Sequence, residues 1–150
     1  MTHKSFDSGP PSVWRFQKAS AGVAAVEFAL LLPFLILLVY GIFAASWILT
    51  IEHGLQQLAS ESARAALAGL DQSERDNLAK SYVSSEVVTY AFIDPSALTV
   101  STATSDQTLS FTVTASYDLS SSPLYPFFIR FIPMPTSVVS RSATIREGGF

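Results

Sequence analysis

Gly22 and Glu27, five positions apart at the start of a long apolar stretch, are the residues whose types and spacing suggest chemistry. If the peptide bond after Gly22 were cut, the new α-amino group on Val23 would lie one helical turn from the Glu27 carboxylate, at positions i and i+4. An α-amine has an ordinary pKa of about 7.7–8.0, so it would be largely protonated at neutral pH. The two opposite charges would then offset each other in apolar surroundings, within one chain or between neighbouring chains.

The same carboxylate has a second interpretation. A charged residue costs about 2.5–3.5 kcal/mol at the centre of a membrane helix and less near its end. In an anchor that is never cut, Glu27 would therefore simply mark the cytoplasmic interface of the membrane. The spacing alone leaves both interpretations open.

The stretch that follows predicts a membrane span. From Phe28 to Ile51 there are 24 residues without a single Asp, Glu, Lys, Arg or His. A helix of that length is about 36 Å long, enough to cross a hydrocarbon core of about 30 Å with some tilt. The excess of Lys and Arg on its N-terminal side places the N-terminus in the cytoplasm. The expected parts are a basic, disordered leader over 1–22, a transmembrane helix over 23–51 with Trp47 near its outer interface, and a periplasmic domain over 52–150.

Composition excludes several classes of protein. Hydrophobic residues make up 49% of the chain and charged residues 14%, against about 25% charged in an average soluble domain. The net charge of −3 excludes a basic nucleic-acid binder, and zero cysteines exclude disulfides and thiol chemistry. The serines lack a G-x-S-x-G context, and the two histidines, His3 and His53, flank the predicted span on opposite sides. We therefore predict no catalytic residue, no metal site and no cofactor.

The residues after the span predict an α+β domain. Small and apolar residues recur at three- and four-residue steps from Leu55 to Leu70, which favours a helix over 52–68. Asp71, three residues before Glu74, forms a capping-box pattern that starts a second helix over about 73–90. Beyond Pro95 the period changes to two, most clearly in the alternating run from Leu109 to Leu119. This pattern predicts a small antiparallel sheet with strands over 97–104, 108–119 and 137–146 and a turn at 105–107.

Two further features each have two interpretations. Pro33 lies inside the apolar helix and cannot donate a backbone hydrogen bond, so we expect a kink or local unwinding there. Such a position either softens the helix or is a tolerated membrane proline. The aromatic and proline-rich segment 124–135 either covers the sheet edge as core or forms an exposed apolar loop that docks on a partner subunit or the membrane surface.

The segment around Gly22 also resembles known sequences. Gly22, Glu27 and the aromatic and aliphatic run after it resemble the processing site of type IV prepilins. The longer string from Ser20 to Ile42, with Pro33 and Gly41 inside it, resembles the TadE-like family of tight-adherence pilus systems.

The resemblance implies that a membrane-embedded aspartyl prepilin peptidase removes the leader on the cytoplasmic side. Gly22 would precede the cut, Val23 would be the first mature residue, and Glu27 would guide processing and subunit docking. Phe28 stands where the major pilins of these systems often carry Tyr, which argues against a major pilin. The implied function is that of a minor pilin or pseudopilin in the assembly of a tight-adherence (Flp-type) pilus.

The resemblance also implies the partners and the location. The partners would be the prepilin peptidase, other pilin or pseudopilin subunits, the pilus assembly platform and the bacterial inner membrane, with no nucleic acid. Two alternatives remain: an uncleaved single-pass anchor carrying a periplasmic interaction module, and a secreted protein whose signal peptide is cut after Ser46. The second is weaker, because the apolar core of a signal peptide usually has about 7–15 residues.

Overall fold

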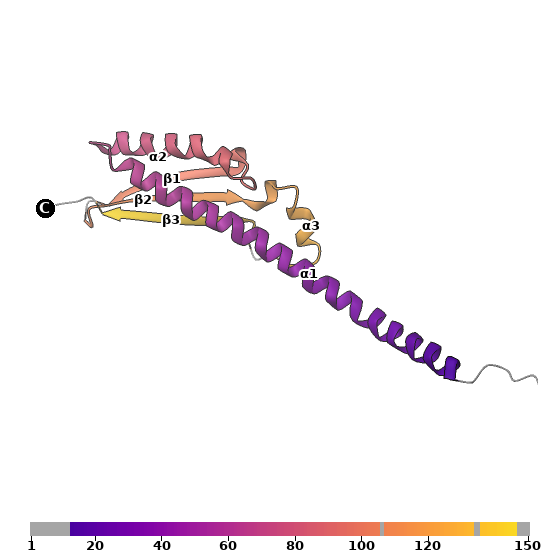
Figure 1. Ribbon diagram of the computed structural model, residues 1–150. Coiled ribbons are helices and arrows are strands. Elements are labelled where there is room, and N and C mark those ends of the chain that lie inside the picture. Colours follow the sequence, from indigo (N-terminus) through magenta and orange to yellow (C-terminus); the bar gives the residue numbers. More distant parts are fainter. Residues whose placement is uncertain (1–12, 106, 134–135, 147–150) are drawn as a thin grey trace, which may run out of the picture. The chain divides into compact units, whose positions relative to one another are not determined.

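The computed structural model describes residues 13–105, 107–133 and 136–146, with side chains from Gly22 onward, and it confirms the α+β class (Figure 1). It divides between Ile42 and Phe43 into two compact units. The elements in chain order are α1 (Val13–Ala66), α2 (Gln72–Glu86), β1 (Leu98–Ser105), β2 (Ser110–Asp118), α3 (Tyr125–Ile129) and β3 (Val138–Arg146), with short 3-10 turns at Val87–Thr89, Pro95–Ala97 and Leu119–Ser121.

The first unit contains the N-terminal length of α1. The helix begins at Val13, so the predicted disorder of the leader is wrong for residues 13–21, and residues 1–12 lie outside the described part of the chain. Residues 13–21 contain no proline or glycine and run directly into the apolar stretch, which lets the helix extend toward the N-terminus. Every residue from Gly22 to Val39 is exposed.

The second unit is built on a three-stranded antiparallel sheet in the order β1-β2-β3. The β1–β2 ladder runs from the pair Leu98 and Tyr117 to the pair Ser105 and Ser110. The β2–β3 ladder runs from the pair Ser110 and Arg146 to the pair Asp118 and Val138. All three predicted strands are present, with bounds that differ from the prediction by at most two residues. Hydroxyl groups bond across the outer face, where Thr112 and Thr144 are 2.8 Å apart and Ser116 and Ser140 are 2.9 Å apart.

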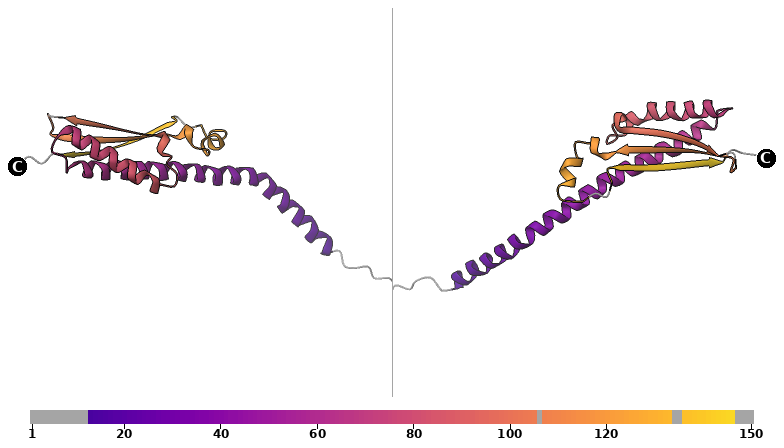
Figure 2. Two further views of the ribbon diagram at one scale, coloured as in Figure 1. Left: turned by 90° about the horizontal axis from the view of Figure 1, so that it is seen from above. Right: turned by 180° about the vertical axis from the view of Figure 1, so that it is seen from behind.

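The core lies between this sheet and the helices, which cover one of its faces (Figure 2). The predicted alternation of β2 is confirmed, because Phe111, Val113, Ala115 and Tyr117 are all buried on that face. Small residues on α1 allow its backbone to approach the sheet closely. The buried α1 residues of this layer are Ile51, Leu55, Leu58, Ala59, Ser62, Ala63 and Ala66.

Asp71 is the N-cap of α2, as predicted, but the reciprocal bond of Glu74 goes to Leu70 rather than to Asp71. The backbone N–H of Glu74 donates to the Asp71 carboxylate at 2.8 Å, and this bond holds the pKa of Asp71 below its usual range. The Glu74 carboxylate in turn accepts from the backbone N–H of Leu70 at 2.7 Å. The first bond satisfies a backbone donor that the start of the helix leaves open, and the second holds the residue before the N-cap.

Helix α2 is also tied to α1 through two side chains. The Tyr82 hydroxyl donates to Glu61 at 2.6 Å. The bond to the nearby carboxylate raises the pKa of Tyr82 to about 12 and lowers the pKa of Glu61. At neutral pH Tyr82 therefore keeps its proton and Glu61 is ionised, so the hydrogen bond between them is formed.

Two residues of the periodic runs in the sequence lie outside the elements that those runs predict. Leu70 is 91% exposed, because α1 ends at Ala66 and the chain turns before Leu70. Leu109 is also exposed, because it lies in the hairpin connection with a φ of 45° rather than in β2. The predicted turn at 105–107 includes Asp106, which lies outside the described residues.

Replacing a core ring should destabilise the second unit far more than replacing a turn residue. Phe111 is fully buried against Ala63, Ala66 and Ala79, so Phe111→Ala should lower the free energy of unfolding by about 3–5 kcal/mol. Leu109→Ala, two residues away, should change it by about 0.5 kcal/mol or less. Denaturant unfolding of the full chain in detergent micelles measures both. Equal effects would contradict the assigned core.

Candidate processing and assembly site

Gly22 lies within α1, where packing gives no reason for a glycine. A Cβ built on Gly22 meets no atom within 4 Å, and Gly41 is equally open. A glycine inside a helix costs about 0.5–1 kcal/mol relative to alanine. By contrast, a Cβ on Gly54 would lie 2.9 Å from the Ile93 side chain, so packing explains that glycine. Packing among the described residues therefore does not explain Gly22.

Glu27 is the acidic residue of an otherwise apolar, exposed helix surface. Between Gly22 and Ile51 the sequence contains no other Asp, Glu, Lys or Arg. Among the side chains that the structure describes, none forms a hydrogen bond or ion pair with Glu27. Since α1 is helical here, Val23 and Glu27 lie one turn apart on the same face, with Phe28 exposed beside them.

Pro33 does not interrupt α1. The helix is continuous from Val13 to Ala66 through this residue, so the local unwinding expected at Pro33 is absent. The predicted kink stays a prediction. Pro33 still leaves the carbonyl of Ala29 without its usual backbone donor, because the ring nitrogen carries no hydrogen.

Among the described residues, one helix is long and apolar enough to cross a membrane. It covers Gly22–Ala66 and has a window of mean hydropathy 2.6. Large apolar side chains are exposed along it from Val23 to Phe43, and the first buried residue is Ala44. The exposed length is about 30 Å, which matches the hydrocarbon core of a bilayer. One long apolar helix of this kind fits a single-pass membrane anchor.

Trp47 differs from the expectation that it marks the outer interface of the span. It is only 6% exposed, and its ring stacks on Phe128 with centroids 5.3 Å apart. Residues 44–51 of α1 thus carry the first core positions of the second unit. An apolar run in the sequence does not show which of its residues face protein.

The aromatic segment 124–135 combines the two interpretations made from the sequence. Phe128 is buried against Trp47, whereas Phe127 and Phe131 are 58% and 59% exposed. Residues 134 and 135 lie outside the described part. The segment therefore supplies core on one side and an apolar surface on the other.

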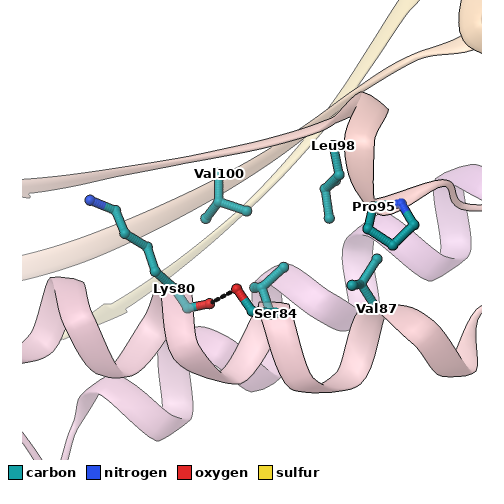
Figure 3. Close-up of a pocket in the computed structure, with 7 residues that line it drawn as sticks. Lys80, Ser84, Val87, Pro95, Leu98 and Val100 are labelled. Carbon is teal, nitrogen blue, oxygen red and sulfur yellow. Dashed lines mark hydrogen bonds between the residues drawn. The ribbon is translucent and has the colours of Figure 1, made fainter.

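A hollow of about 330 Å³ lies between α2 and β1, and its lining does not indicate a catalytic or metal site (Figure 3). The Ser84 hydroxyl donates to the Lys80 carbonyl of its own helix at 2.8 Å. The described residues contain no group of three His, Asp or Glu side chains that would hold a metal ion. The lining residues are Lys80, Val83, Ser84, Val87, Pro95, Leu98 and Val100.

Comparison with protein families matches residues 22–64 to the family described as TadE-like protein. The matched segment begins at Gly22 and includes Glu27, Phe28 and Pro33, which confirms the resemblance seen in the sequence. Comparisons with the curated proteins and with the solved structures find no match.

Proposed function

We propose, from the premise that residues 22–64 form a TadE-like segment, that the chain is a minor pilin or pseudopilin of a tight-adherence (Flp-type) pilus. A TadE-like segment indicates a Tad pilus-associated protein, which is structural rather than enzymatic. The observation that carries the finer proposal is the position of the match. It begins at the glycine that packing does not explain, five residues before Glu27.

In this proposal a prepilin peptidase cuts between Gly22 and Val23, leaving a mature chain from Val23 to Phe150. The bond lies inside α1, so the helix has to open locally before the backbone can lie extended near catalytic carboxylates. Glycine favours both steps, because it weakens a helix and has no Cβ to obstruct a close approach.

After the cut, the Val23 amine and the Glu27 carboxylate carry opposite charges one helical turn apart. Each would be costly alone in a bundle of apolar helices, and the pair is less so. We propose that this pairing, within a subunit or between subunits, favours docking of the chain on other pilin or pseudopilin subunits and on the assembly platform.

The exposed apolar length from Val23 to Phe43 is the part that we propose lies in the inner membrane. The leader 1–22 would be cytoplasmic and the second unit, from Phe43 onward, periplasmic. One observation favours a second candidate, an uncleaved anchor with a periplasmic interaction module. Helix α1 runs without a break through the bond that would be cut.

The orientation gives a first prediction about the anchored chain. A reporter enzyme that is active only in the periplasm should be active when fused after Phe150, because Lys4, Arg15 and Lys18 hold the N-terminus inside. The same reporter fused after Gly22 in a chain truncated there should be inactive. Activity of a cytoplasm-only reporter after Phe150 would contradict the orientation.

Deletion and complementation in the host test the function itself. Removing the chain should abolish or strongly reduce pili counted by electron microscopy, because assembly lacks a subunit. Expression of the full chain from a plasmid should restore them. Normal pili in the deletion strain would overturn the proposed function while leaving the membrane anchor intact.

A further inference from the structure

The two edges of the three-stranded sheet differ in how they are protected. At the β3 edge, the carbonyl of Ser140 accepts a hydrogen bond from the Arg141 guanidinium at 3.2 Å. The carbonyl of Ser142 accepts from the Gln56 amide at 3.5 Å. β1 has eight residues without a charge, a proline or a bulge, and no side chain among the described residues bonds to its backbone. Such features usually protect an edge strand, so the β1 edge is open to pairing with another strand.

The register shows which backbone groups of β1 are free. Just beyond the β2–β3 ladder, the N–H of Leu119 donates to the Ser137 carbonyl at 2.7 Å. Bonded residues alternate in an antiparallel pair, so odd-numbered residues of β2 bond to β3 and even-numbered ones bond to β1. The β1 partners of these even-numbered residues are odd-numbered. The N–H and C=O groups that point away from β2 therefore belong to Val100, Thr102 and Thr104.

The hollow between α2 and β1 lies beside these groups. Leu98 and Val100 of β1 point across it toward α2 (Figure 3). Both are only half-buried, whereas the inward residues of the central strand β2 are buried. Strands pair about 4.8 Å apart and every second side chain faces the same side. A fourth strand along β1 would therefore direct alternate side chains toward the space beneath α2.

The charges indicate which strand fits. Lys80 lies at the hollow and is exposed, and its ammonium has no ion pair among the described residues. A carboxylate on the added strand would pair with it. A second copy of this chain offers no such edge, because β1 has no charge and β3 carries Arg141 and Arg146. The fitting strand is therefore acidic and apolar, and belongs to a different protein.

We propose that β1 binds an extended segment of another protein as a fourth strand, with apolar side chains toward the hollow and a carboxylate on Lys80. In this mode of recognition the main-chain hydrogen bonds give affinity and the side-chain pockets give specificity. The interaction surface goes beyond the proposed function. It depends neither on cleavage after Gly22 nor on the membrane anchor.

Hydrogen exchange of the full chain in detergent micelles, followed by NMR, tests the strand addition. The probe is a synthetic peptide of eight residues in which valine alternates with threonine and one valine is replaced by glutamate. Excess peptide should slow exchange of the amides of Val100, Thr102 and Thr104 several-fold, because they gain acceptors. The amides of Ser140 and Ser142, at the opposite edge, should be unaffected. Unchanged exchange at the β1 edge would overturn the proposal.

Exchange without the peptide distinguishes the other occupants. Slow exchange of the β1 edge that depends on protein concentration would mean that a second copy pairs there. Slow exchange that is independent of concentration would mean that this chain covers its own edge. Either result would overturn the proposal, and both are read from the unmodified chain.

Two proline variants locate the binding. Thr102→Pro removes an outward N–H without removing a donor from the β1–β2 ladder, and an edge strand tolerates such a proline. It should abolish the slowing at positions 100 and 104. Ser142→Pro is the matched control on the β3 edge and should leave the slowing intact. Equal slowing in the two variants would contradict binding at β1.

A charge exchange tests the acidic partner. A peptide with lysine in place of the glutamate should slow exchange in the unmodified chain several-fold less than the glutamate peptide does. In Lys80→Glu the order of the two peptides should reverse, because the exposed side chain then carries the opposite charge. The same order in both chains would overturn the pairing with Lys80.

Discussion

Glu27→Ala should leave the chain in the membrane, at least partly processed, and unable to support piliation. Glu27 is the one acidic residue between Gly22 and Ile51, so the variant removes the only side chain there that can neutralise the new amine of Val23. An unpaired ammonium in an apolar helix bundle costs more than a paired one. Insertion should survive, because the substitution makes the span more apolar.

Two variants make this result specific to the carboxylate. Leu30→Ala removes a larger exposed side chain one turn along α1 and should keep wild-type piliation. Glu27→Asp keeps the charge on a shorter side chain and should restore part of it. Pili are counted by electron microscopy, and membrane levels are checked by immunoblot. Wild-type piliation with Glu27→Ala would mean that the carboxylate only marks the membrane interface.

Gly22→Val should leave the leader attached, so that the protein runs about 22 residues larger on a gel. The Cβ branches of valine would obstruct the close approach of the backbone to the peptidase's catalytic groups. The folded chain itself should tolerate the change, because no atom lies within 4 Å of the new Cβ.

Gly41→Val is the matched control for this variant. Gly41 lies on the same helix, and a Cβ there also meets no atom within 4 Å. Immunoblots of membranes should therefore show Gly41→Val at the processed size and Gly22→Val at the unprocessed size. Equal processing of the two variants would contradict a role for Gly22 before the cut.

Local patterns predict most of the fold because each depends on neighbours in sequence. The alternation of β2 needs only a period of two, and the cap at Asp71 needs only Glu74 three residues later. Leu109 continues the alternation in the sequence but lies outside the strand, because the hairpin connection requires a residue with a φ of 45°. Periodicity cannot locate such a strand end.

Contacts between distant residues are not predictable in this way. In the sequence, the β3 segment lacks a clear apolar alternation because Arg141 occupies one of its inward positions. Arg141 pairs there with Glu52 of α1, 89 residues earlier. Trp47 resembles a membrane-interface residue in the sequence, because apolar neighbours look alike whether lipid or protein covers them. Only the fold shows that Phe128 covers it.

For the candidate site, in contrast, the sequence contributes more than the fold. Gly22, Glu27 and Phe28 stand out in the sequence, because their arrangement depends on spacing along a single helix. The fold contributes the open space around Gly22 and the lack of a described partner for Glu27. It also shows that the proposed cut lies within a helix, which spacing alone does not indicate.

N-terminal sequencing of the protein purified from membranes of its own host tests the central claim most directly. Processing after Gly22 predicts a mature chain that begins at Val23, with the Glu27 carboxylate one helical turn away. A chain that begins at Met1 or Thr2 would contradict it and favour the uncleaved anchor. A chain that begins at Trp47 would contradict both and show that the apolar stretch is a cleaved signal peptide.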